Sequence, residues 1–97
     1  MTATAANIAA WQAHAEQRLA HTLSEVREPP TRMRWTQHPD LGPGAEILGD
    51  VAGRLVLELG CGPGHNLAHL VAHHQATGIG VDVADAQITR ARLHYGH

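Results

Sequence analysis

The stretch that most constrains this chain is "LVLELGCGPGHN", which runs from Leu55 to Asn66. An apolar run leads to an acid, Glu58, and then to three glycines at positions 60, 62 and 64. Glycine loses more backbone freedom on folding than any other residue, so three glycines within five positions need a structural reason. A loop whose backbone approaches a ligand closely, just before a helix, supplies that reason.

The residues on both sides of this loop predict the first unit of a doubly wound α/β fold. The apolar run that begins at Leu55 is typical of a parallel strand buried on both faces. "HNLAHLVAHH" has leucine and valine at helical spacing, which predicts a helix packed by one face on a sheet. "TGIGVD" predicts a second strand and "ADAQITRARLHY" a second helix. This order predicts a parallel pair of strands with a right-handed crossover, in a Rossmann-like doubly wound sheet of which only one β-α-β-α unit is present.

The N-terminal half predicts a long helix followed by a loop. Apolar residues recur at spacings of three and four from Thr4 to Val26, which predicts an amphipathic helix that Pro29 and Pro30 terminate. The proline-rich stretch that follows predicts a loop laid over another element, and "AEILGDVAG" predicts a short helical turn ending at Gly53. The predicted parts are therefore the N-terminal helix (1–28), a connecting loop with a short helix (29–49) and half of a Rossmann-like domain (50–97).

Composition excludes several classes of function. The chain has 97 residues and a formal net charge of -2, and its seven cationic residues are scattered arginines, which argues against nucleic-acid binding. No apolar run reaches the roughly 20 residues that cross a membrane, and the N-terminus lacks the pattern of a secretion signal. We therefore expect a cytoplasmic protein that binds neither nucleic acid nor membrane.

Two side-chain patterns suggest reactive or metal chemistry, and we interpret both as structural. Cys61 is the only cysteine, and we expect it to pack in the loop because no charge partner for a thiolate is evident. His65, His69 and His73 recur every four residues, a spacing that can hold a metal. No acid or cysteine stands at a matching place nearby, so we expect surface histidines and no metal site.

A second acid completes the predicted ligand site. In a doubly wound sheet the ligand lies at the carboxyl ends of the strands, where the glycine loop is placed. Asp82 closes the second strand, where an acid accepts hydrogen bonds from ribose hydroxyls, and Val83 would lie against adenine. A dinucleotide site needs G-x-G-x-x-G, but His65 occupies the place of the third glycine. Glu58 at the edge of the site suits a cationic ligand and repels a pyrophosphate.

At this point "VLELGCGPG" and "GIGVD" together resemble the first two motifs of the class I S-adenosylmethionine-dependent methyltransferases, over Asp50 to Tyr95. The resemblance implies S-adenosylmethionine as cofactor and gives each site residue a role. The methionyl part of the cofactor would be lined by Glu58, Gly60, Cys61 and Gly62. Gly64 would allow close passage of the helix, Asp82 would hold the ribose and Val83 would border the adenine. Many members begin the next helix with Ser-Pro, whereas this chain has Ala84 and Asp85, so a capping hydroxyl is missing.

The resemblance implies methyl transfer to a small-molecule acceptor, and the sequence identifies no catalytic base. Only two strands are predicted, so we expect either the N-terminal segment of a longer enzyme or a truncated remnant that does not catalyse. A nucleotide-binding module for nicotinamide cofactors is the other alternative. The residues Arg32, Arg34 and Trp35 either cover the site or pack on the sheet. We expect exposed sheet edges to allow self-association.

Overall fold

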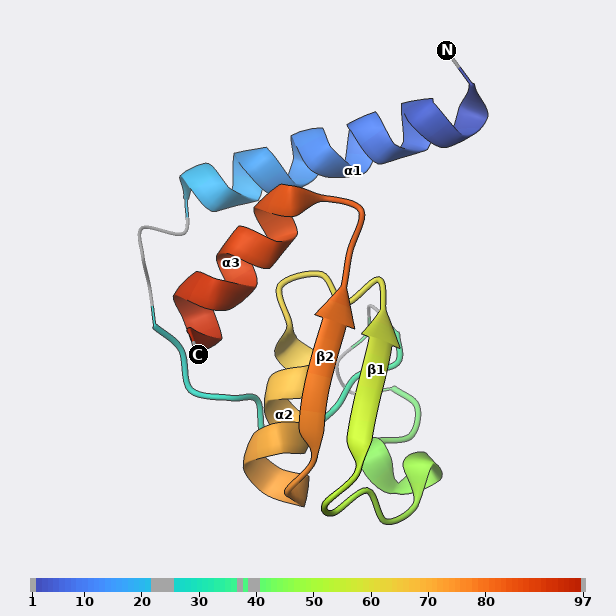
Figure 1. Cartoon of the computed structure of the whole chain (residues 1–97), viewed down its shortest axis with the longest axis vertical. Coiled ribbons are helices and arrows are strands. Elements are labelled where there is room, and N and C mark those ends of the chain that lie inside the picture. The colour runs from blue at the N-terminus through green and yellow to red at the C-terminus, as the bar shows by residue number, and fades with distance from the viewer. Residues whose placement is uncertain (1, 22–25, 37, 39–40, 97) are drawn as a thin grey trace.

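The computed structural model describes residues 2–21, 26–36, 38 and 41–96. Its elements are α1 (Ala3–Ala20), the 3-10 helix η1 (Ala45–Leu48), β1 (Leu55–Leu59), α2 (His65–His74), β2 (Thr77–Val81) and α3 (Asp85–Tyr95). The two strands pair in parallel, with Leu55 opposite Thr77 and Leu59 opposite Val81 (Figure 1). The predicted fold class, a β-α-β-α unit preceded by an N-terminal helix, is therefore confirmed.

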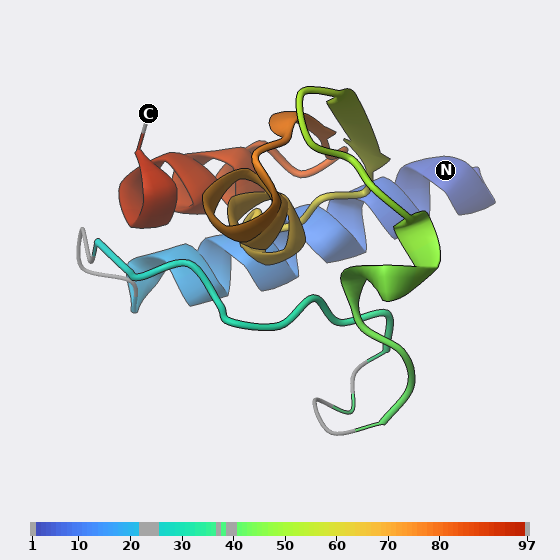
Figure 2. The ribbon, with the colours of Figure 1, turned by 90° about the horizontal axis from the view of Figure 1, so that it is seen from below.

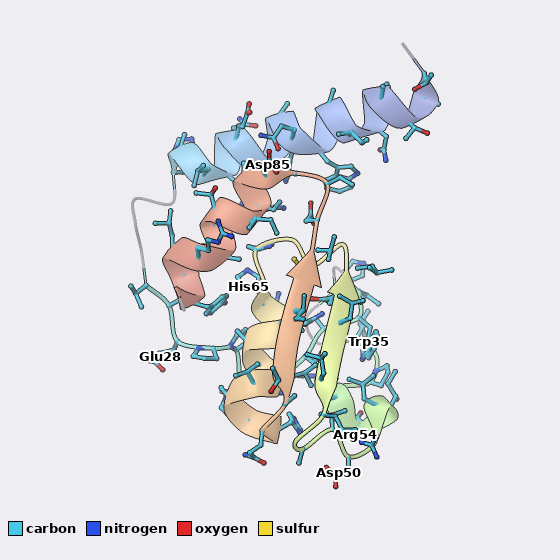
Figure 3. The ribbon with its side chains drawn as sticks, viewed as in Figure 1. Glu28, Trp35, Asp50, Arg54, His65 and Asp85 are labelled. Atoms are coloured by element: carbon cyan, nitrogen blue, oxygen red, sulfur yellow. The ribbon has the colours of Figure 1, made fainter. Side chains whose placement is uncertain are left out.

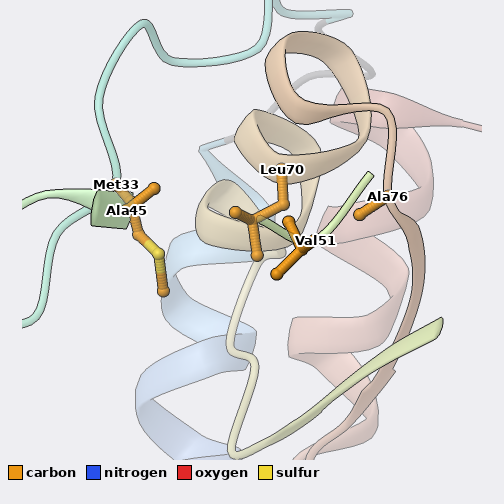
Figure 4. Close-up of a cluster of buried hydrophobic side chains, with 5 residues drawn as sticks. All are labelled: Met33, Ala45, Val51, Leu70 and Ala76. Carbon is orange, nitrogen blue, oxygen red and sulfur yellow. The ribbon is translucent and has the colours of Figure 1, made fainter. Parts of the chain in front are cut away.

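One face of the sheet is covered by α2. Two glycines in β2 allow this close approach, because a Cβ atom at Gly78 or Gly80 would lie 3.1 Å or 2.9 Å from a methyl carbon of Leu67. Leu70, only 1% exposed, is the centre of the main core. That core consists of Met33, Ala45, Val51, Leu70 and Ala76 (Figure 4). It joins the connecting loop and η1 to α2 and the sheet.

The opposite face of the sheet is not covered by any described residues, so the prediction that β1 is buried on both faces is wrong. The exposed fractions of Leu55, Leu57 and Leu59 are 64%, 59% and 76%, and Ile79 and Val81 are each 49% exposed. Successive side chains of a strand point to opposite faces, so a helix on one face shields only every second residue. This uncovered face is turned toward the viewer in Figure 1.

The N-terminal helix is shorter than its sequence predicts. It begins after Thr2, whose hydroxyl accepts a hydrogen bond from Ala5 N, and it ends at Ala20. The prediction that it continues to Val26 is wrong, since Val26 lies in an irregular segment and residues 22–25 are outside the described part. Arg27 N donates to the His94 carbonyl of α3 at 2.9 Å. This backbone N–H therefore makes a tertiary hydrogen bond instead of one within a longer α1. The short turn also ends early, at Leu48 instead of Gly53.

The helix α1 lies across the end of the sheet to which both strands point (Figure 1). Ala15 is fully buried there against Ala84 and Ala86 at the start of α3, with Leu19 packed beside them. The segment 26–36 passes α2 on the side away from the sheet (Figure 2), as the sequence predicts for a loop laid over another element. None of the helices that the structure describes is both long enough and apolar enough to cross a membrane.

Candidate functional site

The glycine loop turns sharply away from the end of β1 and leaves open space above it. The amides of Gly60 and Cys61 donate to the Val81 carbonyl at 2.7 and 3.0 Å, which fastens the loop to the end of β2. Gly60 and Gly62 have φ angles of 69° and 55°, a region that side chains rarely adopt. A Cβ atom at Gly60 would meet nothing within 4 Å, and one at Gly62 would meet only Gln87 Nε2 at 3.8 Å. A ligand can therefore approach the loop backbone.

The last glycine of the loop is needed for packing. Gly64 precedes α2 with a φ of 83°, and a Cβ atom there would lie 3.2 Å from the Ala91 Cβ of α3. The geometry agrees with the expectation that this glycine allows close passage of a helix, and the helix concerned is α3. The loop thus contains two glycines that face open space and one that faces a neighbouring element.

Asp82 links the glycine loop to the start of α3. Its Oδ2 accepts a hydrogen bond from Gly62 N at 2.8 Å, and its Oδ1 accepts one from Ala84 N at 2.9 Å. The sequence places the acid at the ligand edge but does not reveal these two bonds, because the first joins residues 20 positions apart. Ala84, as expected, gives α3 no side-chain cap. Asp82 therefore positions both motifs and keeps further lone pairs for a ligand.

Glu58 is held differently, on the α2 side of the loop. Its Oε1 is buried and has no hydrogen-bond partner among the described residues. Burial raises the pKa of this carboxyl group, and a hydrogen bond from the Asn66 side chain partly opposes the rise. A buried acceptor without a partner is costly, so a cationic group placed beside Glu58 would relieve that cost.

A cavity of about 430 Å³ opens beside Glu58, between the glycine loop, the start of α2 and the segment 27–34. Three arginines line it, Arg27, Arg32 and Arg34. Asn66 fixes the segment there, since its side chain accepts from Arg34 N at 2.9 Å and donates to the Arg34 carbonyl at 2.7 Å. The cavity is therefore lined by guanidinium groups and by two carboxylates, Glu28 and Glu58.

Of the three loop residues that the sequence singles out, two lie at this cavity and one does not. Arg32 and Arg34 line it, and Arg32 also donates from Nη2 to the Gly42 carbonyl. Trp35 instead donates from its indole nitrogen to the Gly44 carbonyl at 2.9 Å, within the connecting loop. In Figure 3, Trp35 lies beyond β1, on the side away from α3.

His65 and Tyr95 were not assigned to the site by the sequence, but both line the same cavity. His65 Nδ1 and the Tyr95 hydroxyl form a hydrogen bond between α2 and α3. Burial, together with the nearby His94 and three arginines, lowers the pKa of His65 to about 4. His65 is therefore neutral near pH 7. The pairing could not be read from sequence, since the two residues are 30 positions apart.

Cys61 has the surroundings of an unreactive thiol. Burial, followed by the carboxylates of Asp82 and Glu58, raises its pKa. A cysteine acts as a nucleophile as the thiolate, which these surroundings disfavour. The geometry agrees with the interpretation of Cys61 as a residue packed in the loop, where its sulfur lies close to Gly80.

The histidine row on α2 is used in packing. His69 is 5% exposed, and its Nδ1 donates to the Pro30 carbonyl at 2.8 Å. Its Nε2 lies 3.1 Å from His74 Nε2, so one ring donates to the other. The expectation that these histidines lie on the surface is wrong for His69, because the segment 26–36 covers that side of α2. Among the residues that the structure describes, no group of three or more potential ligands is placed to hold a metal ion.

A second cavity, of about 500 Å³, opens on the other side of the loop. Asp82 and Val83 line it together with Gly60 and Gly62, and further walls come from α1, from the last residues of both strands and from Gln87 of α3. The predicted site residues therefore fall into two groups around one loop, with Glu58 in the first cavity, Asp82 and Val83 in the second, and Gly60 shared by both.

The family model and the relatives that match this chain are all described as methyltransferases. Residues 56–97 match the family model described as a methyltransferase domain. The chain is 34% identical to a protein of Acinetobacter baylyi named ubiquinone biosynthesis O-methyltransferase. The alignment spans 84 residues, which are 87% of this chain and 29% of that protein. Proteins of the same name from Acinetobacter baumannii and Bordetella avium are 33% and 32% identical over 87% of the chain, which corresponds to 30% and 29% of their lengths. No solved structure gives a significant match.

The chain thus spans under a third of the length of the curated relatives that it matches. The family match covers the glycine loop, Asp82 and α3, and the alignments with the relatives include most of the remaining chain. These findings confirm the resemblance to the class I S-adenosylmethionine-dependent methyltransferases.

Proposed function

We propose that this chain is the cofactor-binding N-terminal segment of an S-adenosylmethionine-dependent methyltransferase that modifies an oxygen atom of a small-molecule acceptor. The observation that carries the proposal is the placement of two carboxylates on opposite sides of an open glycine loop, at the carboxyl ends of two parallel strands. The family match supports the cofactor class. The relatives' name, O-methyltransferase, supports oxygen as the acceptor atom.

The residues on the Glu58 side fit the amino-acid end of such a cofactor. That end carries an ammonium and a carboxylate, and the adjoining sulfur is positively charged. Glu58 lines this cavity, and its carboxylate would accept from the ammonium. Arg34 lines the same cavity and would pair with the carboxylate, since guanidinium groups bind carboxylates strongly. The cavity therefore matches both charges of that end.

The residues on the Asp82 side fit the nucleoside end. Asp82 would accept from the ribose hydroxyls with the lone pairs that Gly62 N and Ala84 N leave free. Val83 is 60% exposed at the same cavity and would lie against the adenine. The bare backbone at Gly60 would let the ligand pass from one cavity to the other.

S-adenosylmethionine, when bound, supplies a methyl group activated by its positively charged sulfur. The contribution of this chain is to hold that group still and in one orientation, which accounts for much of the rate of a transfer between two bound partners. Glu58 and Asp82 fix the two ends of the cofactor, and the loop backbone fixes its middle. The described residues include no group that we assign as a catalytic base.

Calorimetric titration of the chain with S-adenosylhomocysteine, S-adenosylmethionine and NAD⁺ tests the proposal. We expect both adenosyl ligands to bind and NAD⁺ to show no binding at the same concentration, because Glu58 repels a pyrophosphate. Asp82→Asn should weaken binding, and the control Asp85→Asn should not, since Asp85 is a neighbouring acid that lines neither cavity. Binding of NAD⁺ in preference to S-adenosylhomocysteine would favour the nicotinamide-cofactor alternative.

We also propose that the isolated chain associates with itself through its sheet. Apolar side chains on the uncovered face, led by Leu59 at 76% exposed, are accompanied by strand edges that pair with no other described strand. Exposed edges and apolar faces promote association. Light scattering should show oligomers or aggregates, and a monodisperse monomer with a cooperative unfolding transition would contradict this proposal.

A further inference from the structure

The second cavity has a wall that neither the sequence motifs nor the family match explains. The match begins at residue 56, whereas this wall is formed by Asn7 and Trp11 of α1. Trp11 is 52% exposed although it belongs to the apolar stripe of its helix. A tryptophan that remains half exposed beside a cavity offers an aromatic surface to a ligand.

The position of α1 beside this cavity is fixed by packing on α3. Ala15, one helical turn after Trp11 and therefore on the same side of α1, is fully buried against Ala84 and Ala86. The Gln12 side chain accepts a hydrogen bond from Ala86 N at 3.4 Å. The same contacts that hold α1 on the start of α3 therefore hold Trp11 at the end of β2, where Asp82 and Val83 lie.

The chemistry of the cavity suits a flat, apolar ring joined to a polar sugar. Trp11, Val83 and Leu59 supply apolar surface, and Val83 and Leu59 are 60% and 76% exposed. Asp82 supplies the acceptor for hydroxyl groups. A purine nucleoside combines these features, and its volume is compatible with a cavity of about 500 Å³.

We propose that Trp11 binds the adenine ring of the cofactor, with the ring held between the Trp11 indole and Val83. The inference rests on the proposed function, and it extends the cofactor site from the Rossmann-like unit to the N-terminal helix. Asn7 lines the same cavity and offers an amide to the polar edge of the ring. Stacking of a base on an aromatic side chain is strong enough to control the affinity for the ligand.

Tryptophan fluorescence provides the first test, since the chain has only two tryptophans. Trp35→Phe leaves Trp11 as the only tryptophan, which can be excited selectively over Tyr95, and removes a residue that lines neither of the two cavities. Titration of this variant with S-adenosylhomocysteine or adenosine should change the intensity or wavelength of the emission, whereas methionine should not. Unchanged emission at saturating S-adenosylhomocysteine would overturn the inference.

Affinity measurements provide the second test. Trp11→Ala should weaken binding of S-adenosylhomocysteine by about tenfold or more, and Trp11→Phe should retain most of the affinity because it keeps an aromatic face. The control Ile8→Ala also removes an apolar side chain from α1, but one that does not line the cavity, and should leave affinity unchanged. Circular dichroism should show the same helix content in all variants, and if Trp11→Ala fails to fold, Trp11→Phe and the fluorescence titration decide.

The outcomes separate this inference from the proposed function. If the unmodified chain binds S-adenosylhomocysteine and Trp11→Ala binds it equally well, only the role of Trp11 is overturned. If the unmodified chain binds neither S-adenosylhomocysteine nor adenosine, the proposed function fails and the inference fails with it.

Discussion

The two sides of the glycine loop hold their carboxylates in different ways. Asp82 uses both oxygens to accept backbone hydrogen bonds, from Gly62 N and Ala84 N, so it maintains the shape of the loop and also lines the second cavity. Glu58 has a raised pKa and a buried oxygen without a partner among the described residues, so its charged form lowers the stability of the unliganded chain. Under the proposed function, Asp82 would contribute to both folding and binding, whereas Glu58 would contribute to binding at the expense of folding.

The largest effect should come from blocking the loop that both sides share. Gly62→Val places a branched side chain in the open space above the loop, at a φ of 55° that a β-branched residue avoids. We expect no measurable binding of S-adenosylhomocysteine by calorimetry and a helix content by circular dichroism close to that of the unmodified chain.

Gly64→Ala provides the matched control for this prediction. Its Cβ atom would press on Ala91 of α3 instead of entering either ligand cavity, so it should lower the free energy of unfolding more than it lowers affinity. If Gly62→Val binds normally with unchanged circular dichroism, the backbone-approach explanation of the loop is wrong.

The next largest effect should come from Asp82→Ala. Loss of hydrogen bonds to the ribose should lower the affinity for S-adenosylhomocysteine by more than about tenfold. Loss of the two backbone bonds should also lower the free energy of unfolding, by about 1 to 3 kcal/mol. Calorimetry and urea denaturation measure the two effects. Unchanged affinity would refute the assignment of Asp82 to the ribose.

Glu58→Gln should show the opposite combination. Removal of the negative charge should weaken binding of S-adenosylhomocysteine by about tenfold. The free energy of unfolding should stay the same or rise, because the neutral amide avoids the cost of burying a charge. A clear loss of stability on urea denaturation would contradict the comparison between the two acids, since it would show that Glu58 also supports the fold.

The smallest effect should be a pH dependence that comes from Glu58. Its pKa is raised in the unliganded chain, and a bound ammonium would favour the charged carboxylate, so affinity should be complete above the raised pKa and should fall several-fold below it. Stability of the unliganded chain should change in the other direction, with the free energy of unfolding rising as pH falls from the raised pKa toward the ordinary value of 4.5. Calorimetry across this range should show a weaker dependence in Glu58→Gln than in the unmodified chain.

Sequence alone predicts the local structure of the C-terminal half well, because its signals are local. The helix "HNLAHLVAHH" matches α2 residue for residue, and the second strand and helix begin within a residue or two of their predicted positions. The loop glycines and Asp82 also lie where the sequence predicts them, directly after the ends of β1 and β2.

The parts that sequence does not predict depend on contacts between distant residues. The end of α1 at Ala20 is accompanied by the bond from Arg27 N to the His94 carbonyl, and the buried environment of His65 depends on Tyr95. Exposure of Leu57 depends on which elements cover the sheet, a property that an apolar run cannot reveal. The wall formed by Trp11 is missed for a related reason, since helical spacing shows that the residue lies on the apolar stripe but not what faces it.

A crystal structure of the chain with S-adenosylhomocysteine would test the central claim most directly. We expect the ribose hydroxyls within hydrogen-bond distance of Asp82 and the ammonium beside Glu58, with the ligand crossing the backbone of Gly60 and Gly62. A ligand bound elsewhere, or bound at the loop with its ribose away from Asp82, would contradict the account.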